Sequence, residues 1–197
     1  MRDNVAMNSK NPPPWQPEDA GPLPLSSGGE KSPYSPQLHV VLCQPEIPQN
    51  TGNIGRTCLA VGAKLWLVRP LGFRIDDHHL ARAGMDYWPQ LQWQAVDSWD
   101  ALAGELDLHS AWYFTKTASR AVWDASFAVN DVLVFGSESA GLPPSLLAAN
   151  RDRALLIPMR GDARSLNLAS SVAVGVYEAR RQMALQDPII TRWGLDP

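Results

Sequence analysis

The sequence predicts an α/β protein with a mostly parallel sheet and helices on both faces. Between residues 38 and 187, short apolar runs alternate with longer segments of helical periodicity, and this alternation is typical of βαβ units. The chain has 197 residues, of which 45% are hydrophobic and 19% charged, so it can enclose one sizeable core. We therefore expect a single α/β domain.

Six apolar runs are predicted to be strands, and most segments between them helices. The strands are expected over residues 38–43, 64–68, 92–96, 111–115, 131–135 and 153–157. The helices are expected over residues 52–62, 76–83, 98–106, 143–149 and about 166–185. The last helix is apolar or small on nearly every face, so it should lie between its own sheet and something else. That neighbour is either a partner subunit or the rest of a large single core.

The two ends of the chain are predicted to lie outside the domain. Residues 1–36 hold eight of the seventeen prolines and show no apolar periodicity, so residues 1–37 are expected to be a disordered, proline-rich tail. The domain should span residues 38–187, and residues 188–197 should form a C-terminal tail.

Composition excludes several classes of protein. The net charge of −3 argues against a general polyanion-binding surface, so any nucleic-acid contact should be local. We find neither an apolar stretch long enough to cross a bilayer nor a secretory signal, and we expect a cytoplasmic protein. Cys43 and Cys58 lie in apolar runs without CxxC spacing, which predicts buried thiols and no metal site.

Three loops follow predicted strands, where ligands gather in parallel sheets. The first contains NTGNIGRT, residues 50–57, which fits neither the dinucleotide nor the P-loop pattern. It places Arg56 in the first turn of the predicted helix, where the helix dipole disfavours a cation by about 0.3–1 kcal/mol. Either a structural ion pair or a bound anion should therefore hold Arg56. Asn50 or Thr51 could cap this helix.

The second and third loops combine small residues with charged ones. FGSESAGLP, residues 135–143, leaves a strand at Gly136 and carries Glu138, a carboxylate able to hold an arginine. IPMRGDARSLNLASSVAVGVYEARRQ, residues 157–182, begins as a polar loop with two arginines and becomes the last helix. Both loops expose main-chain groups at the carboxyl edge of the sheet.

Together, these three loops resemble the three motifs of the SPOUT class of RNA methyltransferases, in the same order. Within the class, PEIPQNTGNIGRT and RAGMDYW (residues 82–88) are most similar to the minimal tRNA wobble-nucleotide 2′-O-methyltransferases. The resemblance implies methylation of the ribose of cytidine or modified uridine in leucine tRNAs, with S-adenosylmethionine as donor. It also implies a C-terminal deep trefoil knot and a homodimer formed through the last helix.

The resemblance also assigns roles to residues. Arg56 would act at the target ribose and phosphate, oriented by Asn50 and Glu138. Because arginine stays protonated in proteins, we expect Arg56 to stabilise charge, with the proton leaving through the phosphate or a water. The cofactor would be bound mainly through the main chain, by Tyr113, Gly136, Ile157, Ser165, Leu166 and Asn167.

RNA contacts are expected from Arg82, Lys116, Arg164 and Tyr177, and further phosphate contacts from Arg74, Arg120 and Arg160. Trp88 is predicted to stack on a base. Asn50 as a helix cap and Tyr177 as interface packing are the structural alternatives. The alternative functions are methylation of another tRNA position or of ribosomal RNA, and a cofactor-binding RNA-binding module without catalysis.

Overall fold

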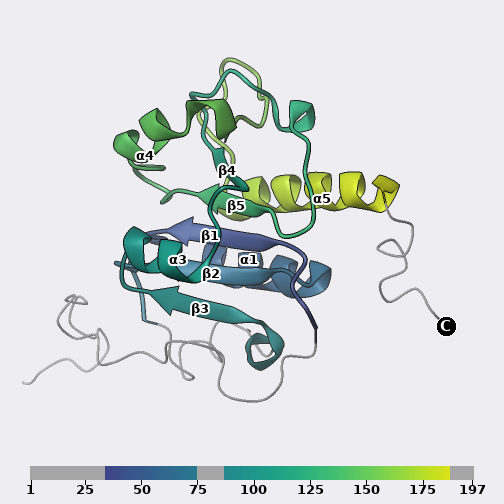
Figure 1. The fold of residues 1–197 in the computed structure, drawn as a ribbon. Coiled ribbons are helices and arrows are strands. Elements are labelled where there is room, and N and C mark those ends of the chain that lie inside the picture. The colour runs from purple at the N-terminus through teal and green to yellow at the C-terminus, as the bar shows by residue number, and fades with distance from the viewer. Residues whose placement is uncertain (1–33, 75–86, 187–197) are drawn as a thin grey trace, which may run out of the picture.

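The computed structural model describes residues 34–74 and 87–186 and contains one six-stranded sheet (Figure 1). All pairings between neighbouring strands are parallel, in the order β3-β2-β1-β5-β4-β6. The strands are β1 (His39–Cys43), β2 (Lys64–Val68), β3 (Trp93–Val96), β4 (Ala111–Phe114), β5 (Val132–Phe135) and β6 (Ala154–Leu155). Each lies within one of the six predicted runs, so the predicted parallel sheet is confirmed.

Four α-helices accompany the sheet in the described residues: α1 (Pro48–Val61), α3 (Trp99–Glu105), α4 (Pro144–Ala149) and α5 (Leu168–Gln186). Single 3-10 turns occur at η2 (Trp88–Gln90), η3 (Val122–Asp124) and η4 (Arg151–Arg153). The helix predicted over residues 76–83 lies outside the described residues. Within residues 34–74 and 87–186, the structure has no helix with the length and apolar character needed to span a membrane.

Helices cover both faces of the sheet, as predicted. On one face, Ile54 of α1 and Val172 of α5 pack into a large apolar cluster with the side chains of Val40 and Leu42. On the other face, Leu102 of α3 and the partly buried leucines of α4 pack against a second cluster. The alternation of side chains along a strand divides β1 between these clusters, because Val41 belongs to the second.

Helix α1 begins four residues earlier than the sequence predicted. Ile47 occupies the N-cap position and Pro48 the first turn. The missing N–H and the fixed φ of proline are well tolerated in the first turn of a helix. Arg56 is consequently the ninth residue of α1, and the expectation that it lies in the first turn was wrong. The helix dipole acts mainly on the terminal turns, so it exerts little penalty on Arg56.

The chain order places a topological switch point beside β1. Strands β2 and β3 lie on one side of β1, whereas β5, β4 and β6 lie on the other (Figure 1). The loop after β1 and the loop after β5 therefore leave the same edge of the sheet as neighbours. Such an edge is where open parallel sheets bind ligands.

The domain begins slightly before the predicted boundary at residue 38. The Tyr34 hydroxyl donates to the carbonyl of Ala63 at 3.2 Å, and the Arg180 guanidinium donates to the Gln37 side chain at 2.8 Å. Residues 34–37 thus pack on the domain. The rest of the predicted N-terminal tail and the C-terminal tail lie outside the described residues.

His39 should give the domain a pH-dependent stability. Its Nδ1 accepts a hydrogen bond from Trp66 Nε1 at 3.2 Å, and burial, followed by the nearby Lys64 charge, lowers the pKa of His39 from 6.5 to about 4. Protonation therefore favours the unfolded chain, and stability should fall between pH 6.5 and 4, by at most about 3 kcal/mol. Below pH 4 this contribution should level off.

The variant His39→Gln keeps a hydrogen-bond acceptor for Trp66 but does not titrate. Urea unfolding at a series of pH values should show a flatter profile for the variant than for the unmodified protein between pH 6.5 and 4. Parallel profiles would mean that His39 does not contribute to the acid sensitivity.

Candidate active site

Glu138 joins the loop after β5 to the start of α1. Its carboxylate accepts hydrogen bonds from the N–H of Glu46 at 2.8 Å, the N–H of Ile47 at 3.3 Å and the Asn50 side-chain amide at 2.8 Å. A carboxylate at this end of a helix also interacts favourably with the helix dipole. Glu138 therefore fixes the first turn of α1 against the neighbouring loop.

Glu46 makes the reciprocal contact from the loop after β1. Its carboxylate accepts from the Ser139 N–H at 3.1 Å and from the Ser139 hydroxyl. The loop after β5 is itself closed by paired main-chain hydrogen bonds between Ser137 and Gly141, of 3.0 and 3.3 Å. The two loops are therefore locked together at the switch point.

Asn167 connects the third loop to the same place. Its side-chain N–H donates to the Asn50 carbonyl oxygen at 2.9 Å, while its own oxygen accepts from the N–H groups of Ala169 at 2.8 Å and Ser170 at 3.3 Å. Asn167 thus caps α5 and holds α1 at once. The three loops selected from the sequence meet through Asn50.

Asn50 is a bridge and does not cap α1. It is the third residue of α1, only 6% exposed, and its amide uses one end for Glu138 and the other for Asn167. The cap alternative considered for Asn50 is therefore wrong, because Pro48 starts the helix earlier. A buried amide satisfied on both sides favours one arrangement of the loops.

Arg56 is an exposed residue of α1 whose guanidinium carbon lies 4.7 Å from the centre of the Tyr87 ring. The described contacts of Glu138 and Asn50 are at the first turn, whereas Arg56 projects from the third. Glu138 and Asn50 thus hold the start of the helix that carries Arg56, and their predicted role in orienting Arg56 stays a prediction. Sequence reasoning missed Tyr87, although it lies in the RAGMDYW segment.

The predicted cofactor residues lie around the carboxyl ends of β4, β5 and β6. Tyr113 pairs with Val134 of β5 and Ala154 of β6, but its buried ring packs beside Trp99, with ring centres 6.2 Å apart. Only the main chain of Tyr113 can therefore line a pocket at that edge. Beyond β6, Ile157 is half-buried, whereas residues 158–167 are exposed.

The segment after β6 is the most exposed part of this edge. Residues 158–167 offer exposed main-chain groups, and Leu166, with 41% of its surface exposed, offers an apolar contact. Main-chain donors and acceptors beside an apolar side chain are typical of small-molecule sites. Among the described residues, no three His, Cys, Asp or Glu side chains gather as metal ligands would.

The predicted RNA-binding residues have different positions. Lys116, Arg164 and Tyr177 are exposed, Arg74 and Arg120 are half-buried, and Arg82 lies outside the described residues. Arg120 lies 5.0 Å from the centre of the Trp112 ring, and Arg160 pairs with Asp162 at 3.0 Å on the surface. Lys116 and Arg164 are thus the predicted cations for which accessibility is clearest.

Trp88 cannot stack on a base, and that prediction was wrong. Its side chain is only 4% exposed and packs against Trp93, with ring centres 5.5 Å apart. The indole is drawn inward because it closes the apolar cluster beneath α1. Sequence alone did not distinguish a buried tryptophan from an exposed one.

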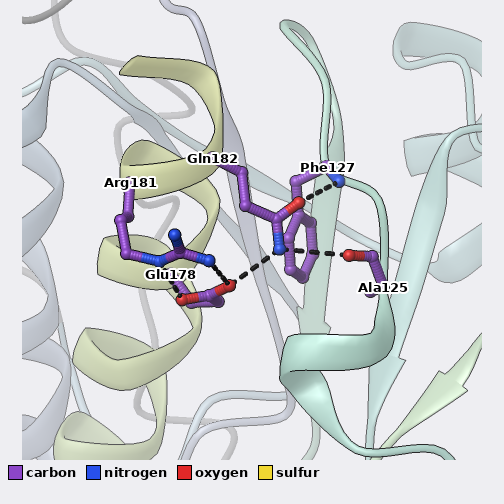
Figure 2. Close-up of polar contacts among 5 residues, drawn as sticks. All are labelled: Ala125, Phe127, Glu178, Arg181 and Gln182. Carbon is purple, nitrogen blue, oxygen red and sulfur yellow. Dashed lines mark hydrogen bonds and ion pairs between the residues drawn. The ribbon is translucent and has the colours of Figure 1, made fainter. Parts of the chain in front are cut away.

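Helix α5 is fixed at its far end by Gln182 (Figure 2). The Gln182 side chain accepts from the Phe127 N–H at 3.0 Å and donates to the Ala125 carbonyl at 3.0 Å and to Glu178 at 2.7 Å. Arg181 donates to the same Glu178 carboxylate. This attachment and the Asn167 cap set the orientation of α5, which leaves Tyr177 with 57% of its surface exposed.

Comparison with known proteins agrees with this geometry. The sequence matches the model of the SpoU rRNA Methylase family over residues 37–177. The chain belongs to this family. A relative from Burkholderia cenocepacia, named tRNA (cytidine(34)-2′-O)-methyltransferase, is 45% identical over 152 residues, covering 76% of this chain and 97% of the relative. The resemblance to RNA methyltransferases inferred from the three loops is thereby confirmed.

Two solved structures extend the comparison within the SpoU family. A protein solved in a study of the 2-OH methylation of C/U34 on tRNA is 47% identical, with a TM-score of 0.69, covering 74% of this chain and 95% of that one. The SpoU methyltransferase AviRb from Streptomyces viridochromogenes, solved with the cofactor AdoMet, is 26% identical, with a TM-score of 0.66, covering 77% of this chain and 60% of that one.

Proposed function

We propose that this protein transfers a methyl group from S-adenosylmethionine to the ribose 2′-hydroxyl of nucleotide 34 of tRNA, with leucine isoacceptors as substrates. The observation that carries the proposal is the meeting of the three loops at Asn50, beside the helix that presents Arg56. The printed name of the Burkholderia relative supports tRNA position 34. The AdoMet complex of AviRb supports the methyl donor.

The donor supplies a methyl group on a sulfonium, from which a neutral thioether departs. The protein must hold the ribose oxygen in line with this methyl group and stabilise the charge that develops on the oxygen. Arg56 clamps the adjoining phosphate through its planar fork of N–H donors. The new bond joins the 2′-oxygen to the methyl carbon, and the hydroxyl proton leaves to the phosphate or a water.

The donor would be held at the carboxyl edge of β4, β5 and β6. The main chain at Tyr113, Gly136 and Ile157, together with Ser165, Leu166 and Asn167, would contact its adenosine and methionine parts. Residues 156–167 would thread the family's trefoil knot to reach this place. The pairing of Leu156 with Arg120 and Val122, which brings residues 118–123 against this segment, supports that path.

We further infer a homodimer formed through α5. One face of α5 packs on the sheet through Val172 and Val176, yet the opposite face exposes Val174 (40%), Tyr177 (57%) and Leu185 (75%). An apolar helix face of this kind is typical of a subunit interface. Across it, Arg164 and Tyr177 would serve the partner's site. Sedimentation of the full chain at the mass of a monomer would contradict this.

Incubation with labelled S-adenosylmethionine and total RNA, followed by mapping of the labelled nucleotide, tests the proposed function. Label at the 2′-oxygen of nucleotide 34 of leucine tRNAs is the expected result. Label confined to ribosomal RNA or to another tRNA position would overturn the assignment of the substrate. Cofactor binding without any label would favour an RNA-binding module without catalysis.

The Asn167–Asn50 contact should be needed for methyl transfer beyond its effect on folding. Asn167→Asp keeps a side-chain oxygen that can cap α5 but loses the N–H group that donates to Asn50. Asn167→Ala loses both the capping oxygen and the N–H group, and loss of the cap should lower the stability by about 1 kcal/mol. We expect Asn167→Asp to stay close to wild type in urea unfolding while kcat/KM falls at least about tenfold. Full activity in Asn167→Asp would show that the contact does not position the loops.

A further inference from the structure

Tyr87 and Trp88 both contact α1, the helix that carries Arg56. The Tyr87 hydroxyl donates a hydrogen bond to the carbonyl of Gly52, one turn before Arg56. The face of the same ring lies 4.7 Å from the guanidinium carbon of Arg56. One tyrosine therefore contacts both the main chain of α1 and the side chain proposed to act on the substrate.

Trp88 fixes the position of this tyrosine. A Cβ on Gly55 would lie 2.7 Å from Cζ3 of Trp88, so the indole occupies the space that a larger residue at position 55 would need. Trp88 is only 4% exposed and its ring also packs against Trp93. The residue that follows Tyr87 in the chain is thus buried on the core side of α1.

The contact between the Tyr87 ring and the Arg56 guanidinium can restrict the conformation of the arginine. An arginine side chain loses rotamer entropy when it is held in one conformation, and a cation–π contact offsets part of that cost. A cation–π contact uses the face of a guanidinium, whereas a phosphate binds to the N–H donors at its edge, so one arginine can make both contacts. Burial raises the pKa of Tyr87, so the phenol stays neutral and keeps its hydrogen bond to Gly52.

We propose that Tyr87 is a positioning residue that holds the Arg56 guanidinium by stacking, so that its N–H edge faces the substrate phosphate. This inference rests on the proposed function of Arg56. In this role Tyr87 would act through Arg56 and would not itself touch the cofactor or the reacting atoms. Gly55 of NTGNIGRT then has a role in the same arrangement, because the absence of a side chain there leaves room for the Trp88 indole.

The experiment compares Tyr87→Phe, which keeps the ring, with Tyr87→Leu, which removes it. In the free protein, the Nε–H resonance of Arg56 should show the upfield ring-current shift of a stacked guanidinium, assigned by its loss in Arg56→Lys. We expect this shift to persist in Tyr87→Phe and to disappear in Tyr87→Leu. Methyl transfer should follow: kcat should fall about 3- to 30-fold in Tyr87→Leu and stay within about threefold in Tyr87→Phe.

A merely structural role would give a different pattern. The melting temperature should fall by a similar amount in Tyr87→Leu and Tyr87→Phe, because both lose the hydrogen bond to Gly52. The affinity for S-adenosylhomocysteine should be the same in Tyr87→Leu as in wild type. In a double-mutant cycle on tRNA affinity, Tyr87→Leu should have no further effect once Arg56 is alanine. Additive losses, or equal losses of kcat in the Phe and Leu variants, would overturn the inference.

The outcomes also separate this inference from the proposed function. Absence of the ring-current shift in the wild-type protein overturns the positioning role whether or not RNA is methylated, and this measurement does not depend on the folding of any Tyr87 variant. Wild-type protein that methylates no RNA overturns the proposed function while the resonance still reports the stacking. If the wild-type protein shows the ring-current shift but kcat is unchanged in Tyr87→Leu, the positioning role alone is overturned.

Discussion

Arg56→Ala is expected to abolish methyl transfer while leaving cofactor affinity intact. Arg56 is exposed on α1, whereas the predicted cofactor residues belong to the ends of β4, β5 and β6 and the segment before α5, so we expect its removal to leave their arrangement unchanged. Loss of a group that stabilises developing charge typically lowers kcat by about 100- to 1000-fold. Single-turnover methylation of tRNA and calorimetry with S-adenosylhomocysteine measure the two effects separately.

Two control variants test whether charge alone accounts for the loss. Arg56→Lys keeps the charge but not the planar fork, and we expect it to recover only a small part of the activity. Arg151→Ala removes an exposed arginine from η4, which directly precedes β6 and so lies at the amino end of that strand, opposite the candidate site. This variant should leave transfer unchanged. Equal losses of transfer and cofactor affinity in Arg56→Ala would show that the arginine is structural.

Gly136→Ala is expected to have the largest effect on stability. An added Cβ would lie 2.0 Å from the carbonyl carbon of Gly141 and 2.2 Å from the nitrogen of Leu142, both main-chain atoms that cannot rotate away. The turn that carries Glu138 would have to open, which should lower the free energy of unfolding by about 3 kcal/mol or more. Urea unfolding at constant pH measures the change.

Gly104 provides a matched control for this substitution. It lies in α3, and an added Cβ would meet no atom within 4 Å. Gly104→Ala should therefore be neutral or stabilise the protein by up to about 1 kcal/mol, since alanine is the better helix former. Similar unfolding curves for the two variants would show that the turn after β5 tolerates a side chain.

Local patterns predicted the sheet well because they needed no knowledge of distant contacts. Each strand is a short apolar run between polar segments, and each such run in the described part of the domain became a strand within a few residues of the prediction. The start of α1 was misplaced because a proline was not considered as its first residue. One face of α5 packs on the sheet, as expected, whereas the second surface expected for this helix stays a prediction.

Contacts between distant residues required the tertiary structure. Nothing in the spacing of Asn50, Glu138 and Asn167 shows that one amide bridges the other two, since 88 and 117 residues separate these pairs. Likewise, Tyr87 and Trp88 are adjacent aromatic residues that the sequence does not distinguish. The Tyr87 ring lies against Arg56, whereas Trp88 is buried beneath α1. The direction of a side chain depends on what packs against it.

The sequence by itself determined the order of strands and helices, the three loops at their ends and the family to which they belong, because periodicity and motif are local properties of the chain. Only the tertiary structure decided that β5 lies beside β1, that Asn50 joins the three loops and that the Arg56 guanidinium lies over the Tyr87 ring. These are consequences of packing, in which residues far apart in the chain are selected for each other by shape, charge and burial.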